Sequence, residues 1–144
     1  MAEFLPYGRQ NVDESDVRAV VDTLRGEYLT TGPAVTRFED GLTAASGARH
    51  AVAVNSGTSA LHAMYFAAGL GAGDEIVTSP LTFAATANAA LYLGATVRFV
   101  DVEPDTGNID ASQVEAALTD RTKLIVPIDF AKGVSLQEWE VPFD

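Results

Sequence analysis

The motif NSGTSAL, residues 55–61, sets three hydroxyl side chains and a glycine directly after the apolar run 51–54. Gly57 would permit a backbone conformation that residues with a Cβ avoid, which turns the N–H groups of Thr58 and Ser59 toward one point. If a helix follows, its unpaired N–H groups and the positive end of its dipole face the same point. The hydroxyl groups of the motif could add hydrogen bonds to the oxygens of an anion. This chemistry fits a group with the size and charge of a phosphate dianion.

Several well-known motifs differ from NSGTSAL in their spacing. The chain lacks both the GxxxxGK[ST] pattern of a P-loop and the three-glycine fingerprint of a dinucleotide site. It also lacks GxSxG at this point, so a nucleophilic serine is poorly supported. The competing interpretation is structural, because Ser56 or Thr58 would serve equally well as the cap of the following helix.

A second candidate is the segment SPLTFAATANA, residues 79–89, which again follows a predicted strand. Phe83 stands where the next helix is predicted to begin. There its ring could stack on a planar ligand held by the first motif. The competing interpretation places Phe83 in the hydrophobic core.

The acidic run DVEPDTGNID resembles a calcium loop only superficially. Its sixth residue is Thr106 where such a loop has glycine, and the twelfth position is Ser112 where the loop has glutamate. No metal site is therefore predicted. A turn at DTGN followed by an N-cap at Asp110, with Gln113 completing a capping box, accounts better for this segment.

Two amphipathic helices are predicted ahead of these motifs. Apolar residues at helical spacing over 17–24 indicate the first, with Asp13 or Ser15 as its cap and Gly26 at its end. Pro33, which is tolerated in a first helical turn, begins the second, and this helix runs to about residue 47.

The remainder alternates between short apolar strands and helices. Such alternation implies parallel pairing with right-handed crossovers, so the predicted fold class is α/β. The length is sufficient for one globular unit, or for a piece of one. The predicted strands are HAVAVN, EIVTS, TVRFVDV and KLIVPI, and the predicted helices are residues 58–70, TFAATANAALYLG and ASQVEAALT.

The composition excludes several classes of protein. Twenty acidic and nine basic residues give a net charge of -11, which disfavours nucleic acid as a partner. The sequence has no cysteine, no leader-like pattern in MAEFLPYGRQ and no apolar run that could span a membrane, so we expect a soluble cytoplasmic protein. His50 and His62 have no neighbours in the sequence that would predict a triad or a metal site.

Taken together, LTTGPAVTRFED, the long stretch from HAVAVN to DTGNID, and KLIVPIDFA resemble the N-terminal part of the DegT/DnrJ/EryC1/StrS family over residues 5–131. Members of this family are fold-type I, pyridoxal-phosphate-dependent aminotransferases that act mostly on nucleotide-linked keto sugars. The resemblance implies that residues 1–132 form an incomplete large domain of the aspartate aminotransferase type. In that domain a mainly parallel sheet with flanking helices follows the two N-terminal helices. Residues 133–144 do not match the family pattern and are expected to form a separate tail.

The resemblance also implies roles for individual residues. Thr58 and Ser59, with the backbone of Gly57, would hold the phosphate of pyridoxal phosphate, and the ring of Phe83 would lie against its pyridine face. The family forms homodimers with shared active sites. Three loop residues would lie near the entrance for the nucleotide sugar, close to the subunit interface: Thr30, Thr31 and Gly32.

One part of the family's chemistry has no counterpart in this sequence. The family uses an aspartate under the pyridine nitrogen and a Schiff-base lysine, both downstream of the DFA segment. Neither Lys123 nor Lys132 matches that lysine, so no catalytic residue is assigned. A complete enzyme would pass nitrogen from a donor such as glutamate to the cofactor and then to a keto sugar. Without the lysine that moves the proton, the chain alone is expected not to transaminate.

Two other functional hypotheses stay open. The chain could be a non-catalytic module that binds a phosphorylated ligand, or that dimerises with a full-length relative through its N-terminal helices. A nucleotide-binding oxidoreductase is the least supported hypothesis, because the glycine fingerprint is missing.

Overall fold

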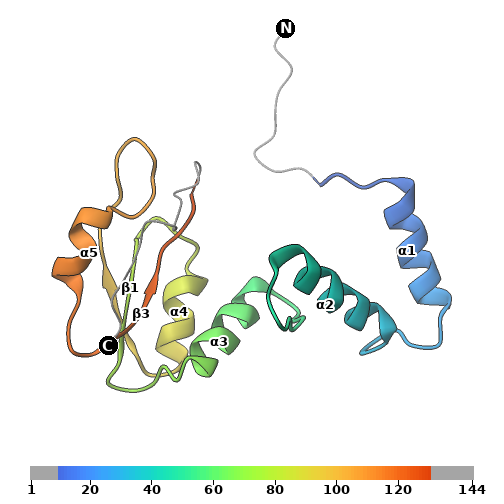
Figure 1. The fold of residues 1–144 in the computed structure, drawn as a ribbon, viewed down its shortest axis with the longest axis horizontal. Helices are drawn as coiled ribbons and strands as arrows, with labels where there is room; N and C mark the ends of the chain where they lie inside the picture. Colours follow the sequence, from blue (N-terminus) through green and yellow to red (C-terminus); the bar gives the residue numbers. More distant parts are fainter. Residues whose placement is uncertain (1–9, 131–144) are drawn as a thin grey trace, which may run out of the picture. The chain divides into compact units, whose positions relative to one another are not determined.

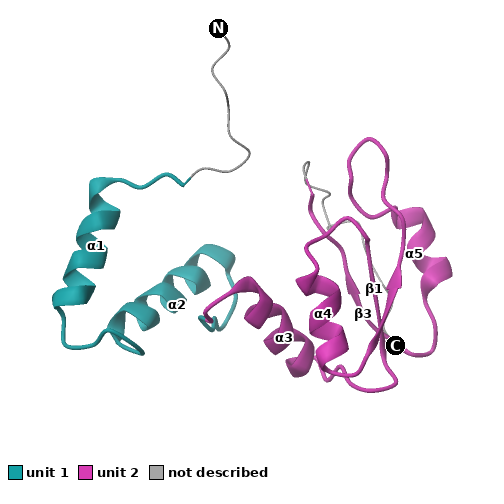
Figure 2. Ribbon diagram, turned by 180° about the vertical axis from the view of Figure 1, so that it is seen from behind, with its two compact units in different colours: residues 1–53 teal, residues 54–144 magenta. Residues whose placement is uncertain are grey.

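The computed structural model describes residues 10–130 of the chain. The chain divides into two compact units, residues 1–53 and residues 54–144 (Figure 2). The sequence had suggested one globular unit, or a piece of one. No helix within the described range is long and apolar enough to cross a bilayer. The predicted tail, 133–144, lies outside the described residues.

The first unit begins with α1, Glu14–Arg25, and its ends are those that the sequence predicts. Asp13 is the N-cap, because its carboxylate accepts the N–H groups of Ser15 (2.7 Å) and Asp16 (3.2 Å). The Asp16 carboxylate accepts the Asp13 N–H in return and completes a capping box. The helix ends at Gly26, whose N–H donates to the carbonyl of Thr23 at 3.2 Å.

The second helix of this unit is α2, Pro33–Ser46, with Pro33 in the first turn as predicted. It ends at Gly47, whose φ of 71° lies in the left-handed region that a C-terminal glycine adopts readily. Neither α1 nor α2 has a buried residue. Their apolar side chains are instead exposed: Val17, Val20, Leu24, Val35, Phe38 and Leu42.

The strand predicted at HAVAVN is absent. Residues 51–54 pair with no strand among residues 10–130, and Val52 is 78% exposed. A strand is defined by the neighbour that takes up its backbone hydrogen bonds. Here the N–H of Ala53 donates instead to the side chain of Glu39 on α2, at 2.8 Å.

The second unit contains a three-stranded parallel sheet in the order β2-β1-β3 (Figure 1). The strands are β1, Glu75–Thr78, β2, Thr96–Phe99, and β3, Thr122–Val126. The first two lie inside segments that the sequence predicts as strands, and β3 begins one residue before the predicted KLIVPI. All four residues of β1 are buried, as expected for the central strand of a parallel sheet.

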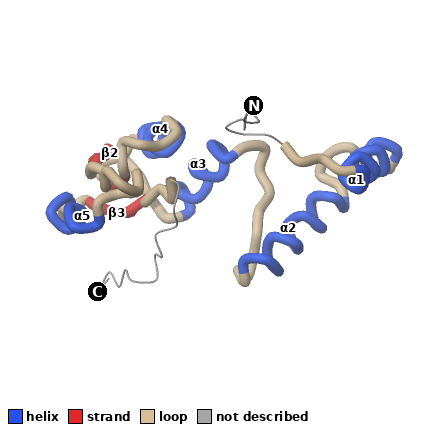
Figure 3. Tube along the Cα trace, turned by 90° about the horizontal axis from the view of Figure 1, so that it is seen from above, coloured by secondary structure: helices blue, strands red, loops and turns tan. Residues whose placement is uncertain are grey.

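Helices cover both faces of this sheet, with α5 on the face opposite α4 (Figures 1 and 3). Their bounds are α3, Gly57–Ala67, α4, Ala85–Tyr92, and α5, Ala111–Ala117. Ile76 points into the cluster under α3 and α4, and Val77 points into the cluster under α5. The first cluster consists of Tyr65, Leu70, Ile76, Ala89, Ala90 and Ala95, and the second of Val77, Val100, Ile109 and Val114.

Asp110 is the N-cap of α5, as predicted, and its carboxylate accepts the N–H of Ser112 at 3.0 Å. This hydrogen-bonding, above all the hydroxyl of Ser112, lowers the pKa of the Asp110 carboxyl group. The predicted capping box is wrong. The Asp110 carboxylate accepts the N–H of Ser112 and not that of Gln113, and the Asp110 N–H donates to the carbonyl of Asp101. The side-chain amide of Gln113 instead donates to the Asp110 carboxylate.

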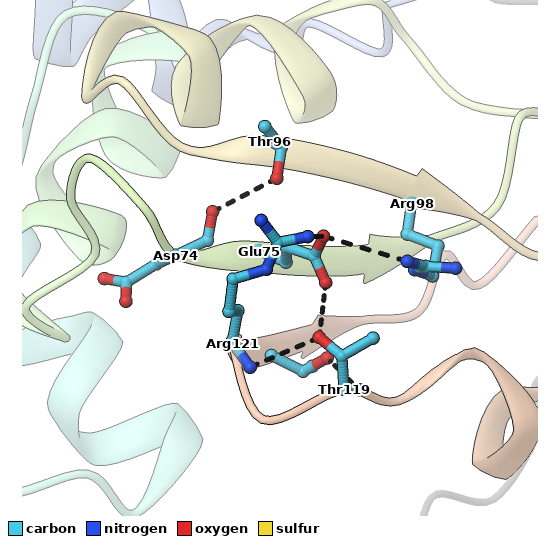
Figure 4. A network of polar contacts seen from close by, with 7 residues as sticks. Asp74, Glu75, Thr96, Arg98, Thr119 and Arg121 are labelled. Atoms are coloured by element: carbon cyan, nitrogen blue, oxygen red, sulfur yellow. Dashed lines mark hydrogen bonds and ion pairs between the residues drawn. The ribbon is translucent and has the colours of Figure 1, made fainter.

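A polar cluster holds the amino end of the sheet together (Figure 4). Glu75 begins β1, and its side chain is only 6% exposed. Its carboxylate accepts from the hydroxyl of Thr119 at 2.5 Å and from Arg121 Nη2 at 2.6 Å, and Arg98 Nη2 of β2 lies 3.8 Å away. The Thr119 hydrogen bond, followed by the charges of Arg121 and Arg98, lowers the pKa of Glu75 against the opposing effect of burial. This charged cluster lies at the amino end of β1.

Candidate functional site

The motif NSGTSAL forms the N-terminus of α3, and much of its polar chemistry is local. Ser56 is the N-cap, with its Oγ accepting the N–H of Ser59 at 3.2 Å. The hydroxyl of Ser59 donates to Asn55 Oδ1 at 2.7 Å, and the hydroxyl of Ser56 donates to Ser59 Oγ at 3.1 Å. The capping interpretation is thus confirmed for Ser56, and Ser59 already uses both of its hydrogen-bond donors within the chain.

The conformational argument for Gly57 is wrong. Gly57 is the first residue of α3 and has no positive φ, so its backbone is one that other residues adopt. A Cβ built at this position would meet nothing within 4 Å. Glycine therefore leaves open space beside the first turn of α3, and no contact within the described residues requires a glycine there.

Three donors at this helix end have no partner within the described part of the chain. The N–H groups of Gly57 and Thr58 bond to no described acceptor, and neither does the hydroxyl of Thr58, a half-buried residue. They stand at the positive end of the 11-residue helix α3. Two backbone amides and a hydroxyl in this place form a donor set that suits the oxygens of a phosphate group.

Phe83 is 80% exposed, which excludes the core-filling interpretation. It lies two residues before α4, on the loop that leaves β1. The residues around it are held in place, because Thr82 Oγ1 lies 2.8 Å from Thr86 Oγ1 in the first turn of α4. The carbonyl of Phe83 accepts the N–H of Thr86 at 3.0 Å. An exposed ring on an ordered backbone is suited to lie against a planar ligand.

The two helices that carry these groups lie side by side on one face of the sheet (Figure 1). The hydroxyl of Tyr65 in α3 donates to the carbonyl of Thr86 in α4 at 3.2 Å. Burial raises the pKa of Tyr65, so this hydroxyl keeps its proton. Because α3 leads to the amino end of β1 and α4 leaves its carboxyl end, both helices begin on the carboxyl side of the sheet.

The three predicted substrate residues lie in the first unit, on the loop between α1 and α2. Thr31 has a φ of 52°, a left-handed conformation that costs a β-branched residue on the order of 1–3 kcal/mol. A Cβ on Gly32 would lie 2.5 Å from Tyr28 Cβ, so only glycine fits there. A cavity of about 470 Å³ beside this loop is lined by Tyr28, Thr31, Gly32, Pro33, Thr36 and Arg37.

The two lysines and the histidine of α3 were further candidates for reactive side chains. Lys123 is the second residue of β3, near the amino end of the sheet, and Lys132 lies outside the described residues. His62 packs edge-on against Tyr92, with ring centroids 5.9 Å apart. Among residues 10–130 no three histidine, aspartate or glutamate side chains gather as a metal site.

Comparison with known families decides the relationship. The sequence model of the DegT/DnrJ/EryC1/StrS aminotransferase family matches residues 10–139. The chain belongs to this family. A DegT/DnrJ/EryC1/StrS relative, the spore coat polysaccharide biosynthesis protein SpsC of Bacillus subtilis, is 47% identical over 127 residues. Those residues are 88% of this chain and 33% of SpsC.

Another relative points to the same group of enzymes. The UDP-4-amino-4-deoxy-L-arabinose–oxoglutarate aminotransferase of Shewanella sediminis is 42% identical over 134 residues, 93% of this chain and 34% of the relative. The chain therefore spans about a third of the length of the relatives that it matches. Homologues of this chain are sugar aminotransferases.

Solved structures place the fold among the same enzymes. 3-Amino-5-hydroxybenzoic acid synthase superimposes with a TM-score of 0.82 at 35% identity, over 92% of this chain and 35% of the synthase. NtdA of Bacillus subtilis, with bound cofactor PMP, superimposes with a TM-score of 0.73 at 36% identity, over 81% of this chain and 28% of NtdA. The fold is that of the pyridoxal-phosphate-dependent aminotransferases, and pyridoxal phosphate is the cofactor of the family.

Sequence reasoning missed two residues that shape the candidate site. Asn55 holds the hydroxyl of Ser59, and Tyr65 joins α3 to α4. The position of Asn55, four residues before Ser59, is a signal that could have found the first. No local signal identifies the second, because Tyr65 and Thr86 are 21 residues apart.

Proposed function

We propose that this chain supplies the phosphate-binding turn and the ring-contacting aromatic of a pyridoxal-phosphate-dependent aminotransferase that acts on a nucleotide-linked keto sugar. The observation that carries the proposal is the set of three donors without partners at the N-terminus of α3: the N–H groups of Gly57 and Thr58 and the hydroxyl of Thr58. Membership of the DegT/DnrJ/EryC1/StrS family supports it. The name of the Shewanella relative, which contains a UDP-linked amino sugar, supports the nucleotide linkage.

The residues of this chain would bind and orient the cofactor. Gly57 and Thr58 would bind its phosphate, and the α3 dipole would add to the attraction. The hydroxyl of Ser59 would have to turn away from Asn55 to reach the phosphate, so Ser59 would contribute less to phosphate binding. Phe83 would cover one face of the pyridine ring and exclude water from it. The bound cofactor supplies the electron sink for nitrogen transfer between glutamate, or a similar donor, and the keto sugar.

The loop with Thr30, Thr31 and Gly32 would contact the nucleotide sugar. The left-handed Thr31 supports this assignment, since strained residues are concentrated at functional sites. The proposal includes a homodimer, in which this loop would lie close to the subunit interface. It also keeps the cytoplasmic location that the cysteine-free composition suggests.

The chain alone is proposed to be inactive. Lys123 lies in β3 near the amino end of the sheet, away from the side on which α3 and α4 begin, so it cannot shuttle a proton at that site. The test is to mix the purified chain with pyridoxal phosphate and glutamate. We expect binding without turnover and without a band that borohydride fixes to a lysine. Turnover together with a single labelled lysine would contradict this part of the proposal.

One observation favours a second function, that of a dimerising module. The helices α1 and α2 bury none of their residues and expose apolar side chains, which is unusual for an isolated unit. Light scattering of the chain, alone and mixed with a full-length relative, separates the two functions. A stable complex without pyridoxal phosphate binding would support the module.

A further inference from the structure

Three loops leave the carboxyl ends of the three parallel strands and meet at one side of the sheet. They are residues 79–84 after β1, residues 100–110 after β2 and residues 127–130 after β3. The first of them carries Phe83. What holds these loops together determines how firmly that ring is placed.

Asn108 joins the second loop to the third. It is 1% exposed, and its Oδ1 accepts the backbone N–H of Phe130 at 2.8 Å. Its own backbone is fixed, since its carbonyl accepts the N–H of Glu103 at 2.8 Å and its N–H donates to Thr106 Oγ1 at 3.2 Å. A hydrogen-bonded turn thus presents a buried amide to the loop that follows β3.

Gly107 brings the first loop into the same contact. Its φ of 72° lies in the left-handed region, and a methyl group built on it would lie 2.8 Å from Phe130 Cδ1 and 3.3 Å from Leu81 Cδ2. The side chains of Leu81 and Phe130 therefore both pack against the bare backbone of Gly107. Any larger residue would have to displace the Phe130 ring.

We propose that Asn108 is a positioning residue that, with Gly107, clamps the three loops so that Phe83 is held ready for the cofactor ring. The ring stands two residues beyond Leu81, and the Thr82–Thr86 hydroxyl contact holds it from the other side. Asn108 acts through Phe130 and Leu81 and touches no cofactor. The proposal rests on the proposed function for the role of Phe83, whereas the clamp itself is a property of this chain. Holding a contact residue in place before binding increases affinity by removing the ordering cost.

The test compares Asn108→Ala with Ile76→Val, a matched control that destabilises the core under α3 and α4 without touching the loops. Backbone ¹⁵N order parameters are measured for Leu81, Thr82 and Phe83, because they report fast local motion separately from global stability. We expect values of about 0.85 in the unchanged chain and in the control, and below about 0.6 in Asn108→Ala. The dissociation constant for pyridoxal phosphate should rise several-fold in Asn108→Ala only.

Each result decides the proposal. Unchanged order in Asn108→Ala would overturn it, and so would lost order with an unchanged dissociation constant. If the unchanged chain binds no pyridoxal phosphate, the proposed function fails for this chain and the order parameters alone decide whether Asn108 clamps the loops. If Asn108→Ala does not fold, Phe130→Ala replaces it. The Phe130 side chain is 52% exposed, so its removal should leave the chain folded. Order at Leu81 must then fall, or the clamp is refuted.

Discussion

Ser56 and Thr58 occupy the same helix terminus, and we propose different roles for them: Ser56 caps the helix, and Thr58 binds a phosphate group. Ser56→Ala removes the oxygen that accepts the N–H of Ser59. Loss of such an N-cap costs about 0.5–2 kcal/mol of unfolding free energy. Thr58→Val removes a hydroxyl that bonds to nothing in the described chain, so its cost should stay within about 0.5 kcal/mol. Urea unfolding followed by circular dichroism measures both values.

Affinity for phosphate should show the reverse order. A hydrogen bond to a charged group contributes about 1.5–3 kcal/mol, which corresponds to a 10- to 150-fold change in the dissociation constant, roughly. We therefore expect Thr58→Val to weaken pyridoxal phosphate binding by about that factor. Ser56→Ala should weaken it less, because this variant keeps the Thr58 hydroxyl as well as the amides of Gly57 and Thr58. Calorimetric titration measures these constants.

A matched control is Thr36→Val on α2. The hydroxyl of Thr36 is exposed and has no hydrogen bond in the described structure, so neither stability nor affinity should change. The reasoning is refuted if Thr58→Val destabilises the chain as much as Ser56→Ala while the affinity stays the same. That outcome would mean that Thr58 serves the fold and not a ligand.

Three further predictions concern the sheet and the aromatic ring. The hydrogen bond from Thr119 lowers the pKa of Glu75 in the folded chain. The stability that this group contributes is therefore present above its unfolded pKa of about 4.5 and is lost as the pH falls through the lower folded pKa. Glu75→Gln should remove this part of the decrease in melting temperature at acid pH. Phe83→Ala should change the unfolding free energy by less than about 0.5 kcal/mol, since the ring is 80% exposed, and should weaken pyridoxal phosphate binding; a large loss of stability would show that the ring packs in the fold. Ile76→Ala, at a fully buried position, should cost about 2–5 kcal/mol in urea unfolding, and a smaller cost would mean that the core under α4 is loosely packed.

The helix ends could be predicted from the sequence because they depend on neighbours in the chain. Asp13, Gly26, Pro33 and Asp110 all act within four residues, where hydrogen-bonding patterns are local. The three strands of the sheet were also predictable, since their apolar runs are short and each is bounded by turn residues.

Other features could not be read from local patterns. The run 51–54 has the composition of a strand, but strand formation needs a partner, and the Ala53 N–H is taken by Glu39. Gly57 looked conformationally special, although the first turn of a helix accepts many residues. The residues alone left a structural and a ligand-binding interpretation open for both Thr58 and Phe83, because a cap and a phosphate site share the same residue types. The resemblance to a family favoured the ligand-binding one.

The most direct measurement is a ¹H–¹⁵N NMR titration of the chain with pyridoxal phosphate, with inorganic phosphate as a second ligand. If the α3 terminus binds the phosphate group, the amide signals of Gly57 and Thr58 shift and saturate with either ligand, and Phe83 responds to pyridoxal phosphate alone. If both ligands leave Gly57 and Thr58 unmoved, or shift only signals elsewhere in the chain, the phosphate site is not at this helix and the central claim is wrong.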